Sequence, residues 1–252
     1  MKHDFEVIIV GAGGSGLAAA VAVCERGGSV LVLEKQPQPG GTTGIAVGSF
    51  TAAGTRWQHK AGIEDDPEAH AEDAARFAPA DIESRNHNEL RRYFLGEAAA
   101  TLEWVQAFGL SFVGPNPEPP NRVPRMHNVV PGAKAYVAAL HMALIRGGGI
   151  LQCGAPVRSL IEANGRVVGV RAEVDGRMQE FTAERGVILA AGDYASNPQM
   201  IAEHKGERFG GIEGINPFAT GDGHRLAQQA GARMVNLDVT YGPDLRFVAS
   251  VR

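Results

Sequence analysis

A glycine-rich turn near the N-terminus constrains the fold more than any other feature of this sequence. It follows residues 7–10, a wholly apolar run typical of a strand buried on both faces of a parallel sheet. Residues 16–26 are rich in Ala, Leu and Val and end at Gly27, which predicts a helix. Residues 30–33 form a second apolar strand. Strand, helix and strand within about thirty residues predict a right-handed βαβ unit.

The turn itself fits the spacing G-x-G-x-x-G, with its glycines at Gly11, Gly13 and Gly16. The first glycine permits a tight turn, the second lets the backbone approach a pyrophosphate, and the third lets helix and strand pack closely. The N-terminus of the helix then offers unpaired N–H groups to the phosphates. The pattern indicates a dinucleotide site, against the simpler reading of a glycine-rich turn with a structural role only.

An acidic residue stands where a dinucleotide site needs one. Glu34 closes the second strand, 23 residues after Gly11. Its carboxylate can accept hydrogen bonds from both ribose hydroxyls of an adenosine, and it would repel a 2′-phosphate. The sequence therefore disfavours NADP, and the alternative for Glu34 is a solvated glutamate.

The middle of the chain reads as a mainly helical excursion over about residues 60–130, with its helices between 67 and 108. Residues 40–54 are rich in Gly, Thr and Ala and predict an ordered loop or a short helix. The stretch 114–124 holds five prolines, so we expect no regular element there. A helix is predicted at 133–146.

An antiparallel meander is predicted over about residues 149–183. Its strands at 156–163 and 166–174 are joined by Asn164-Gly165, and Asp175-Gly176 precedes a third strand. Both dipeptides suit tight hairpin turns because their residues accept positive φ. A separate buried strand is predicted at 187–190, followed by helices near 198–205 and 222–230.

Composition excludes several classes of function. The 252 residues carry a net charge of -4 and no run of Lys and Arg, so we expect no nucleic-acid partner. Cys24 and Cys153 lack C-x-x-C spacing, which argues against a zinc site or a disulfide framework, and we expect no metal. No apolar run reaches the roughly 18 residues of a membrane span, and glycines interrupt the N-terminal stretch, so the sequence indicates a cytoplasmic protein.

Several stretches resemble one family of flavoproteins. Residues 34–43 (EKQPQPGGTT) are similar to the stretch that carries backbone past the phosphates of FAD, and residues 40–53 and 62–68 resemble the loop that follows it. Residues 187–197 (VILAAGDYASN) and 220–223 (TGDG) resemble two later motifs. Together they resemble the fumarate reductase/succinate dehydrogenase flavoprotein superfamily, in the branch of soluble fumarate reductases and 3-ketosteroid Δ1-dehydrogenases.

The resemblance implies an α/β fold. Its parts are a Rossmann-like FAD-binding domain over residues 1–235 with a parallel central sheet and an antiparallel three-stranded meander, and the start of a truncated substrate-capping domain over 236–252. No histidine stands at 40–44, where relatives with covalent flavin carry one, so FAD is expected to be non-covalent. The implied FAD contacts are Gly11, Gly13, Gly14, Ser15, Gly16, Glu34, Lys35, Gly41, Thr42, Thr43, Gly48, Val157, Ala191, Gly192 and Asp222.

Two of these contacts have equally simple alternatives: Val157 as an ordinary strand residue and Asp222 as a helix cap. The sequence also departs from the family pattern where Asp193 follows Gly192 and where Ser49 follows Gly48, which puts the local approach of the backbone to the cofactor in doubt.

The implied reaction is oxidation or reduction of a CH–CH group in a small-molecule substrate, with hydride transfer through flavin N5. Residues 239–243 (VTYGP) are similar to a segment of the ketosteroid dehydrogenases, which favours a ketosteroid-like enone. The alternatives are a fumarate reductase-like enzyme for small dicarboxylates, a catalytically silent FAD-binding subunit, and a fragment that holds no cofactor. Family members continue well beyond residue 252, so a second polypeptide could supply the missing C-terminal half.

No motif in the sequence assigns a catalytic role to a particular residue. Tyr241, Arg125, His127 and Arg246 are candidates for proton transfer, and Arg122 or Arg125 could hold a substrate carboxylate. The ordinary alternatives are a buried structural tyrosine, solvated arginines and a loop histidine. The family's acid/base residues are expected to lie largely outside this chain.

Overall fold

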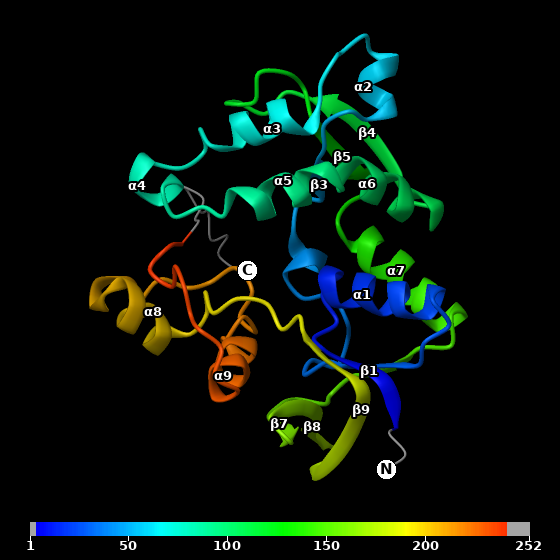
Figure 1. Cartoon of the computed structure of the whole chain (residues 1–252), viewed down its shortest axis with the longest axis vertical. Coiled ribbons are helices and arrows are strands. Elements are labelled where there is room, and N and C mark those ends of the chain that lie inside the picture. Colours follow the sequence, from blue (N-terminus) through cyan, green and yellow to red (C-terminus); the bar gives the residue numbers. More distant parts are fainter. Residues whose placement is uncertain (1–3, 241–252) are drawn as a thin grey trace, which may run out of the picture.

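The computed structural model describes residues 4–240, which contain a central six-stranded sheet (Figure 1). Its strand order is β6-β2-β1-β9-β8-β7. The first four strands are parallel: β6 (Ile150–Gln152), β2 (Val30–Leu33), β1 (Phe5–Val10) and β9 (Arg177–Leu189). The predicted parallel central sheet is therefore confirmed.

The predicted meander joins this sheet instead of standing apart from it. β7 (Val157–Ala163) and β8 (Arg166–Val174) pair antiparallel, and β8 pairs with the first half of β9. The second half of β9 pairs parallel with β1, so the strand predicted at 187–190 is the end of the third meander strand. The predicted start at residue 149 is wrong, because β6 pairs parallel with β2.

The two faces of the parallel strands are covered differently, one by helices and the other mainly by the meander. α1 (Gly14–Glu25) and α7 (Lys134–Arg146) pack on one face, where Ile9, Leu17 and Leu144 are completely buried. The other face buries Ile8 and Leu31 against the meander and against Leu226 of α9 (Asp222–Gln229). Alternate residues of a strand point to opposite faces, so the apolar run of β1 fills both layers.

A second, three-stranded sheet takes two of its strands, β4 (Ser111–Asn116) and β5 (Met126–Val130), from the excursion that the sequence predicted as mainly helical. Its order is β3 (Ser49–Thr51), β5, β4. The helices around it begin with α2 (Arg56–Lys60) and α3 (Pro67–Ala74). They continue with α4 (Ala80–Glu83), α5 (Asn88–Gly96) and α6 (Ala98–Ala107), so the helical prediction for 67–108 is confirmed but two strands were missed.

The proline-rich stretch is partly regular, contrary to expectation. β4 runs through Gly114, Pro115 and Asn116, with a shift of register between Val113 and Asn116. β4 lies at the edge of its sheet, where a proline without an N–H removes no hydrogen bond from a neighbouring strand. The expected loop or short helix at 40–54 is the 3-10 helix η1 (Thr42–Ile45), followed by β3.

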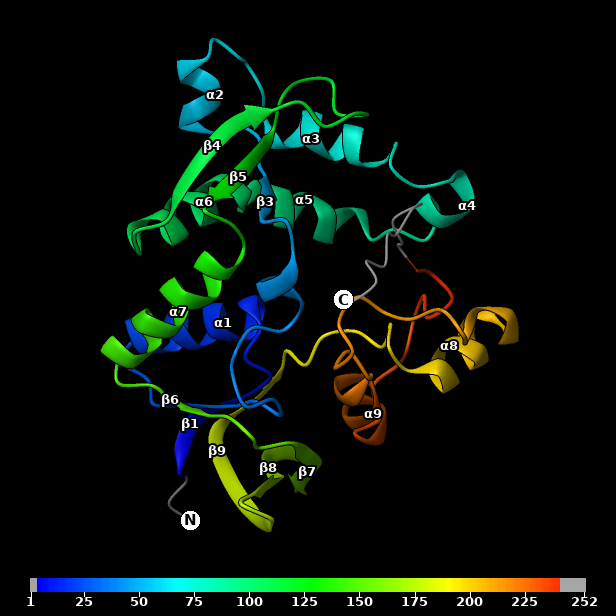
Figure 2. The same cartoon turned by 180° about the vertical axis from the view of Figure 1, so that it is seen from behind.

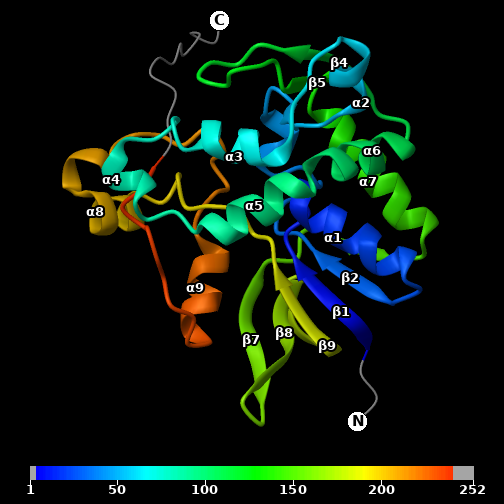
Figure 3. The same cartoon turned by 45° about the horizontal axis from the view of Figure 1, so that its top comes forward.

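The last described part of the chain forms an arm of helices beside the sheet (Figures 2 and 3). It contains α8 (Pro198–Lys205), the 3-10 helix η2 (Glu207–Phe209) and α9, so both helices predicted here are confirmed. The predicted capping domain at 236–252 falls mostly outside the described residues. The boundary at residue 235 stays a prediction.

Candidate functional site

A cavity of about 400 Å³ opens where the parallel strands β1, β2 and β9 end. Its walls come from the β1–α1 turn, the residues after β2, the start of η1, the start of β7, the segment after β9 and the start of α9. Ligands of open α/β sheets bind outside the carboxyl ends of the strands, so the fold puts this cavity where a cofactor belongs.

Most of the expected cofactor contacts meet in this cavity. It is lined by Gly11, Gly13, Gly14, Ser15, Glu34, Lys35, Gly41, Thr42, Thr43, Val157, Ala191, Gly192 and Asp222. Thr220, Asn216 and Phe218 also line it, and no motif in the sequence singles out the last two. Two expected contacts, Gly16 and Gly48, are not among the lining residues.

Two glycine segments form one wall of the cavity without side chains. Gly13 and Gly40 make an isolated parallel β-bridge, and the Gly14 N–H donates to Thr43 Oγ1 at 3.1 Å. A Cβ on Gly13 would meet nothing nearer than the Cα of Gly41 at 3.9 Å, so it would occupy open space. The first-turn N–H groups of α1 have no partner within the helix. Bare backbone with free N–H groups can approach a phosphate closely.

Gly16 and Gly48 are needed for packing instead. A Cβ on Gly16 would collide with the carbonyl oxygen of Gly11, so this glycine lets α1 pack against the turn. A Cβ on Gly48 would lie 2.7 Å from Val129 Cγ1. The Gly48 carbonyl accepts hydrogen bonds from the Val129 N–H at 3.1 Å and the Tyr136 hydroxyl at 3.2 Å.

Glu34 is buried at the edge of the cavity and held in place by backbone. Its Oε2 accepts the Ala12 N–H at 2.7 Å, and its Oε1 accepts the Gln36 N–H at 2.9 Å. An ionised carboxylate has about four acceptor positions. Two of them remain for ribose hydroxyls, and the backbone bonds fix the orientation in which the carboxylate presents them.

Lys35 and Asp222 pair across the cavity. The Lys35 Nζ lies 2.6 Å from Asp222 Oδ2 and donates to Thr220 Oγ1 at 2.8 Å. Burial raises the pKa of Asp222, but the hydrogen bond and charge of Lys35 outweigh it and hold that pKa below its usual value. A second link joins Asn216 Nδ2 to Thr42 Oγ1 at 3.1 Å. These bonds tie the arm that carries α9 to the residues after β2 and to η1.

Arg125 does not reach this cavity. It is fully buried just before β5, where its Nε and Nη2 donate to Asp65 at 2.6 and 2.7 Å. Its Nη1 donates to Asp73 at 2.7 Å and to Asn121 at 2.9 Å. Burial raises the pKa of Asp65, but the hydrogen bonds from Arg125 and Gln58 outweigh it and lower that pKa overall. The guanidinium is thus committed to the protein's own carboxylates.

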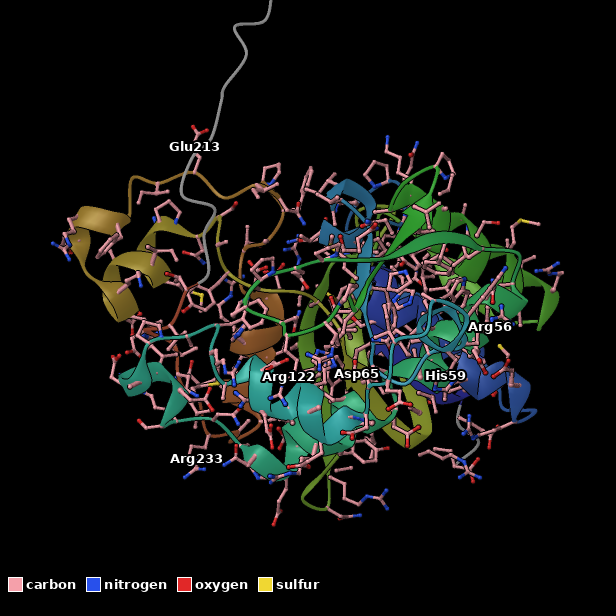
Figure 4. All side chains as sticks on the ribbon, turned by 90° about the horizontal axis from the view of Figure 1, so that it is seen from above. Arg56, His59, Asp65, Arg122, Glu213 and Arg233 are labelled. Carbon is pink, nitrogen blue, oxygen red and sulfur yellow. The ribbon has the colours of Figure 1, made fainter. Side chains whose placement is uncertain are left out.

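The other candidates for proton transfer or for binding a substrate carboxylate are also placed away from the cavity or outside the described residues. His127 is fully buried, with Nε2 3.1 Å from Thr55 Oγ1 and Nδ1 3.3 Å from the Phe50 carbonyl, and burial lowers its pKa. Arg122 pairs with Asp73 and Glu72 beside α3 (Figure 4). Tyr241 and Arg246 lie beyond the described residues.

The parallel sheet, the side-chain-free turn at the first strand–helix junction and the acid after the second strand define a dinucleotide-binding protein of the Rossmann-like class. The FAD binding domain family matches residues 6–243, and the chain belongs to that family. The cofactor is therefore FAD. The glycine wall and the fixed carboxylate of Glu34 suit the phosphates and ribose of its adenosine half.

Several known reductases are similar to this chain in sequence. A probable fumarate reductase of Shewanella frigidimarina is 28% identical over 97% of the chain and 42% of its own length. A urocanate reductase of Eggerthella lenta is 30% identical over 94% of the chain and 40% of its own length. The chain thus spans well under two thirds of the length of these relatives.

Solved structures show the same fold. The open conformation of a flavocytochrome c3 fumarate reductase matches with a TM-score of 0.86 and 28% identity, over 93% of this chain and 42% of that one. A 3-ketosteroid-Δ4-(5α)-dehydrogenase of Rhodococcus jostii RHA1, solved with 4-androstene-3,17-dione, matches with a TM-score of 0.82 and 24% identity, over 94% of this chain and 56% of that one.

Within residues 4–240, none of the helices has the length and apolar character needed to cross a membrane. The same residues contain no group of three or more His, Cys, Asp or Glu side chains that could hold a metal ion. Cys24 and Cys153 are free thiols.

Proposed function

We propose that this chain is the FAD-holding part of an oxidoreductase that acts on a CH–CH group. The observation that carries the proposal is the meeting, in one cavity, of the side-chain-free Gly13–Gly41 wall and the fixed carboxylate of Glu34. The reductases and dehydrogenases among its relatives support the reaction class.

Each part of the cavity has a role in this proposal. The N–H groups of Gly13 and Ser15 hold the pyrophosphate, and Glu34 accepts bonds from the ribose. Val157 lends backbone groups to the adenine, and the backbone of Ala191 and Gly192 faces the cofactor from the third strand end. The segment from Gly41 to Thr43 leads toward the ring. Residues 40–44 contain no histidine, which supports non-covalent binding.

When bound, FAD accepts or donates a hydride at its N5 position. The described residues hold and orient that cofactor, and the proton transfer that completes the reaction is assigned to residues outside them. Tyr241 and Arg246 remain the candidates within the sequence. The two free thiols support our placement of the protein in a reducing compartment, the cytoplasm.

The proposed substrate is a ketosteroid-like enone. The VTYGP segment supports it, and so does the state of Arg125, which is bound to Asp65 and Asp73 and has no pair of donors left for a substrate carboxylate. The competing candidate is a small dicarboxylate, supported by the similarity to fumarate reductases. A third candidate is a silent FAD-binding part that needs further polypeptide for turnover, supported by the greater length of the relatives.

Cofactor binding is tested with Gly13→Val. The added side chain would fill the open space in front of the glycine wall, so FAD binding, measured by flavin absorbance of the purified protein and by titration, should be abolished while thermal unfolding of the apoprotein stays unchanged. Gly132→Val is the matched control, because a Cβ there meets nothing within 4 Å and lies outside the cavity. Unchanged FAD affinity in Gly13→Val would remove this cavity from the proposal.

The reaction is tested by dye-linked turnover of the flavin-loaded chain. Reduction of the dye with a 3-ketosteroid such as 4-androstene-3,17-dione, and none with succinate, is the expected result. Turnover with succinate alone would replace the enone by the dicarboxylate. Absence of turnover with both, in protein that holds FAD, would favour the silent FAD-binding part.

A further inference from the structure

A second cavity, of about 850 Å³, lies between β3, α3 and the α5–α6 helices. α3 and α5 run side by side with β3 next to them in both side views (Figures 1 and 2). The cavity shares no lining residue with the cofactor cavity. Its volume falls within the roughly 300–1,000 Å³ typical of sites for small molecules.

The wall formed by α5 is apolar and open to solvent. Leu90, Tyr93 and Phe94 stand at spacings of three and four residues, which puts them on one face of the helix. They are 62%, 70% and 68% exposed, and Phe77, from the segment after α3, is 51% exposed. Large apolar side chains gathered at one hollow on a protein surface mark a place where something apolar binds.

The charges around this cavity disfavour an anion. None of the described residues that line it is a Lys or an Arg, whereas Glu97 and Glu118 contribute carboxylates. The guanidinium groups of Arg122 and Arg125 are bound to buried Asp73 and Asp65, and those of Arg91 and Arg92 on α5 pair with Glu83 and Glu68. An anionic ligand would meet two carboxylates here and no compensating cation.

One wall residue carries a buried polar atom that has no hydrogen-bond partner among the described residues. His70 of α3 lines the cavity, is only 5% exposed, and its Nδ1 makes no hydrogen bond within residues 4–240. Burial, followed by the positive charge of Arg125, lowers the pKa of His70 to about 4, so the imidazole is neutral at neutral pH. A neutral imidazole can both donate and accept a hydrogen bond.

We propose that this cavity is a second ligand site, which takes a neutral, apolar ring compound carrying one hydroxyl or carbonyl group. The face of α5 with Tyr93 and Phe94 packs against the rings, and His70 bonds the polar group. Glu97 and Glu118 exclude carboxylates and phosphates. The proposal needs neither FAD nor turnover, so it stands or falls separately from the proposed reaction.

The first test is fluorescence titration with Nile red, a neutral apolar dye. The protein should bind it saturably, and Phe94→Asp should weaken binding at least tenfold. Phe94 is mostly exposed, so the substitution leaves the fold intact, which circular dichroism checks. Met142→Asp is the matched control. Met142 is 53% exposed on helix α7 and is not among the residues that line the cavity. Absence of saturable binding, or equal loss in both variants, would overturn the site.

The second test asks whether His70 recognises a polar group on the ligand. It measures how well three probes with the same ring system compete with Nile red. We expect 2-naphthol to compete about five- to tenfold better than naphthalene, and 2-naphthoate to compete least. In His70→Leu the advantage of 2-naphthol over naphthalene should vanish while Nile red still binds. Tighter competition by 2-naphthoate than by 2-naphthol in the unchanged protein would contradict the charge argument, and that comparison needs no variant.

Discussion

The regions around the two sheets of this protein are stabilised by different interactions. Around the six-stranded sheet, the interior is apolar, and one wall of the cofactor cavity is backbone, where Gly13 and Gly41 face each other without side chains. Around the three-stranded sheet, the centre holds charges. Arg125 and Asp73 are completely buried, with Arg125 Nη1 2.7 Å from Asp73 Oδ2, and Asp65 is almost completely buried.

The difference has a physical consequence. The glycine wall carries no titratable or charged side chain, so it depends on local chain geometry. A buried ion pair is costly to place in a protein interior, and removing one partner leaves an unpaired buried charge, at about 3–5 kcal/mol. The cofactor region should therefore be sensitive to added volume, and the three-stranded region to lost charge and to acid.

The largest effect should come from Arg125→Met. The substitution keeps much of the side-chain volume but leaves Asp65 and Asp73 buried without their cation, so the free energy of unfolding should fall by about 3–5 kcal/mol. Urea unfolding measures it. Arg92→Met is the matched control, because the Arg92–Glu68 pair is more than half exposed on both sides and is worth about 0–1 kcal/mol.

Two outcomes would change the comparison. If Arg125→Met and Arg92→Met lose equally little stability, the buried cluster does not hold the three-stranded region together. If Arg125→Met folds normally but loses catalytic turnover in the flavin-loaded protein, Arg125 returns as a candidate for chemistry.

A smaller effect is expected in acid. Burial, with the charge of Arg125, holds the pKa of His70 at about 4, below the value of 6.5 expected when the chain is unfolded. Between these values the unfolded chain binds more protons, so stability should fall as the pH drops from 6.5 to 4, by about 1–3 kcal/mol. The lowered pKa of His127 acts in the same direction.

Urea unfolding at pH 7 and at pH 4.5 measures this loss. His70→Leu should reduce the difference in stability between the two pH values, whereas replacing His59, an exposed residue of α2, by Leu should leave it unchanged. A pH dependence that is the same in all three proteins would show that His70 is not buried in its neutral form.

The sequence predicts those parts of the fold and of the site that depend on residues close together in the chain. The βαβ unit and Glu34 are encoded within about thirty residues, and both appear where the pattern puts them. The three-stranded sheet was missed because β3 is three residues long and β4 contains Pro115. Neither short strand shows the alternation by which strands are recognised.

The role of Arg125 could not be read from the sequence either. Its partners Asp65 and Asp73 lie 60 and 52 residues away, and nothing local distinguishes a buried paired arginine from one that binds a substrate. The long strand β9 is a similar case, because its change from an antiparallel to a parallel partner depends on where β1 lies. Tertiary placement decides these features.

The smallest effect should come from the ion pair that joins two walls of the cofactor cavity. Lys35 and Asp222 are each about one quarter exposed and join two walls of the cavity at 2.6 Å. A partly exposed pair contributes about 0.2–1 kcal/mol, so Lys35→Met should weaken FAD binding about two- to fivefold, and salt should shrink the difference by screening the pair. Titration with FAD at low and high salt measures both. Arg225→Met is the control, because Arg225 pairs with the other oxygen of Asp222 from within α9 and does not link the walls. If both variants weaken FAD binding equally, the charge of Asp222 matters for the cofactor and the link between the walls does not.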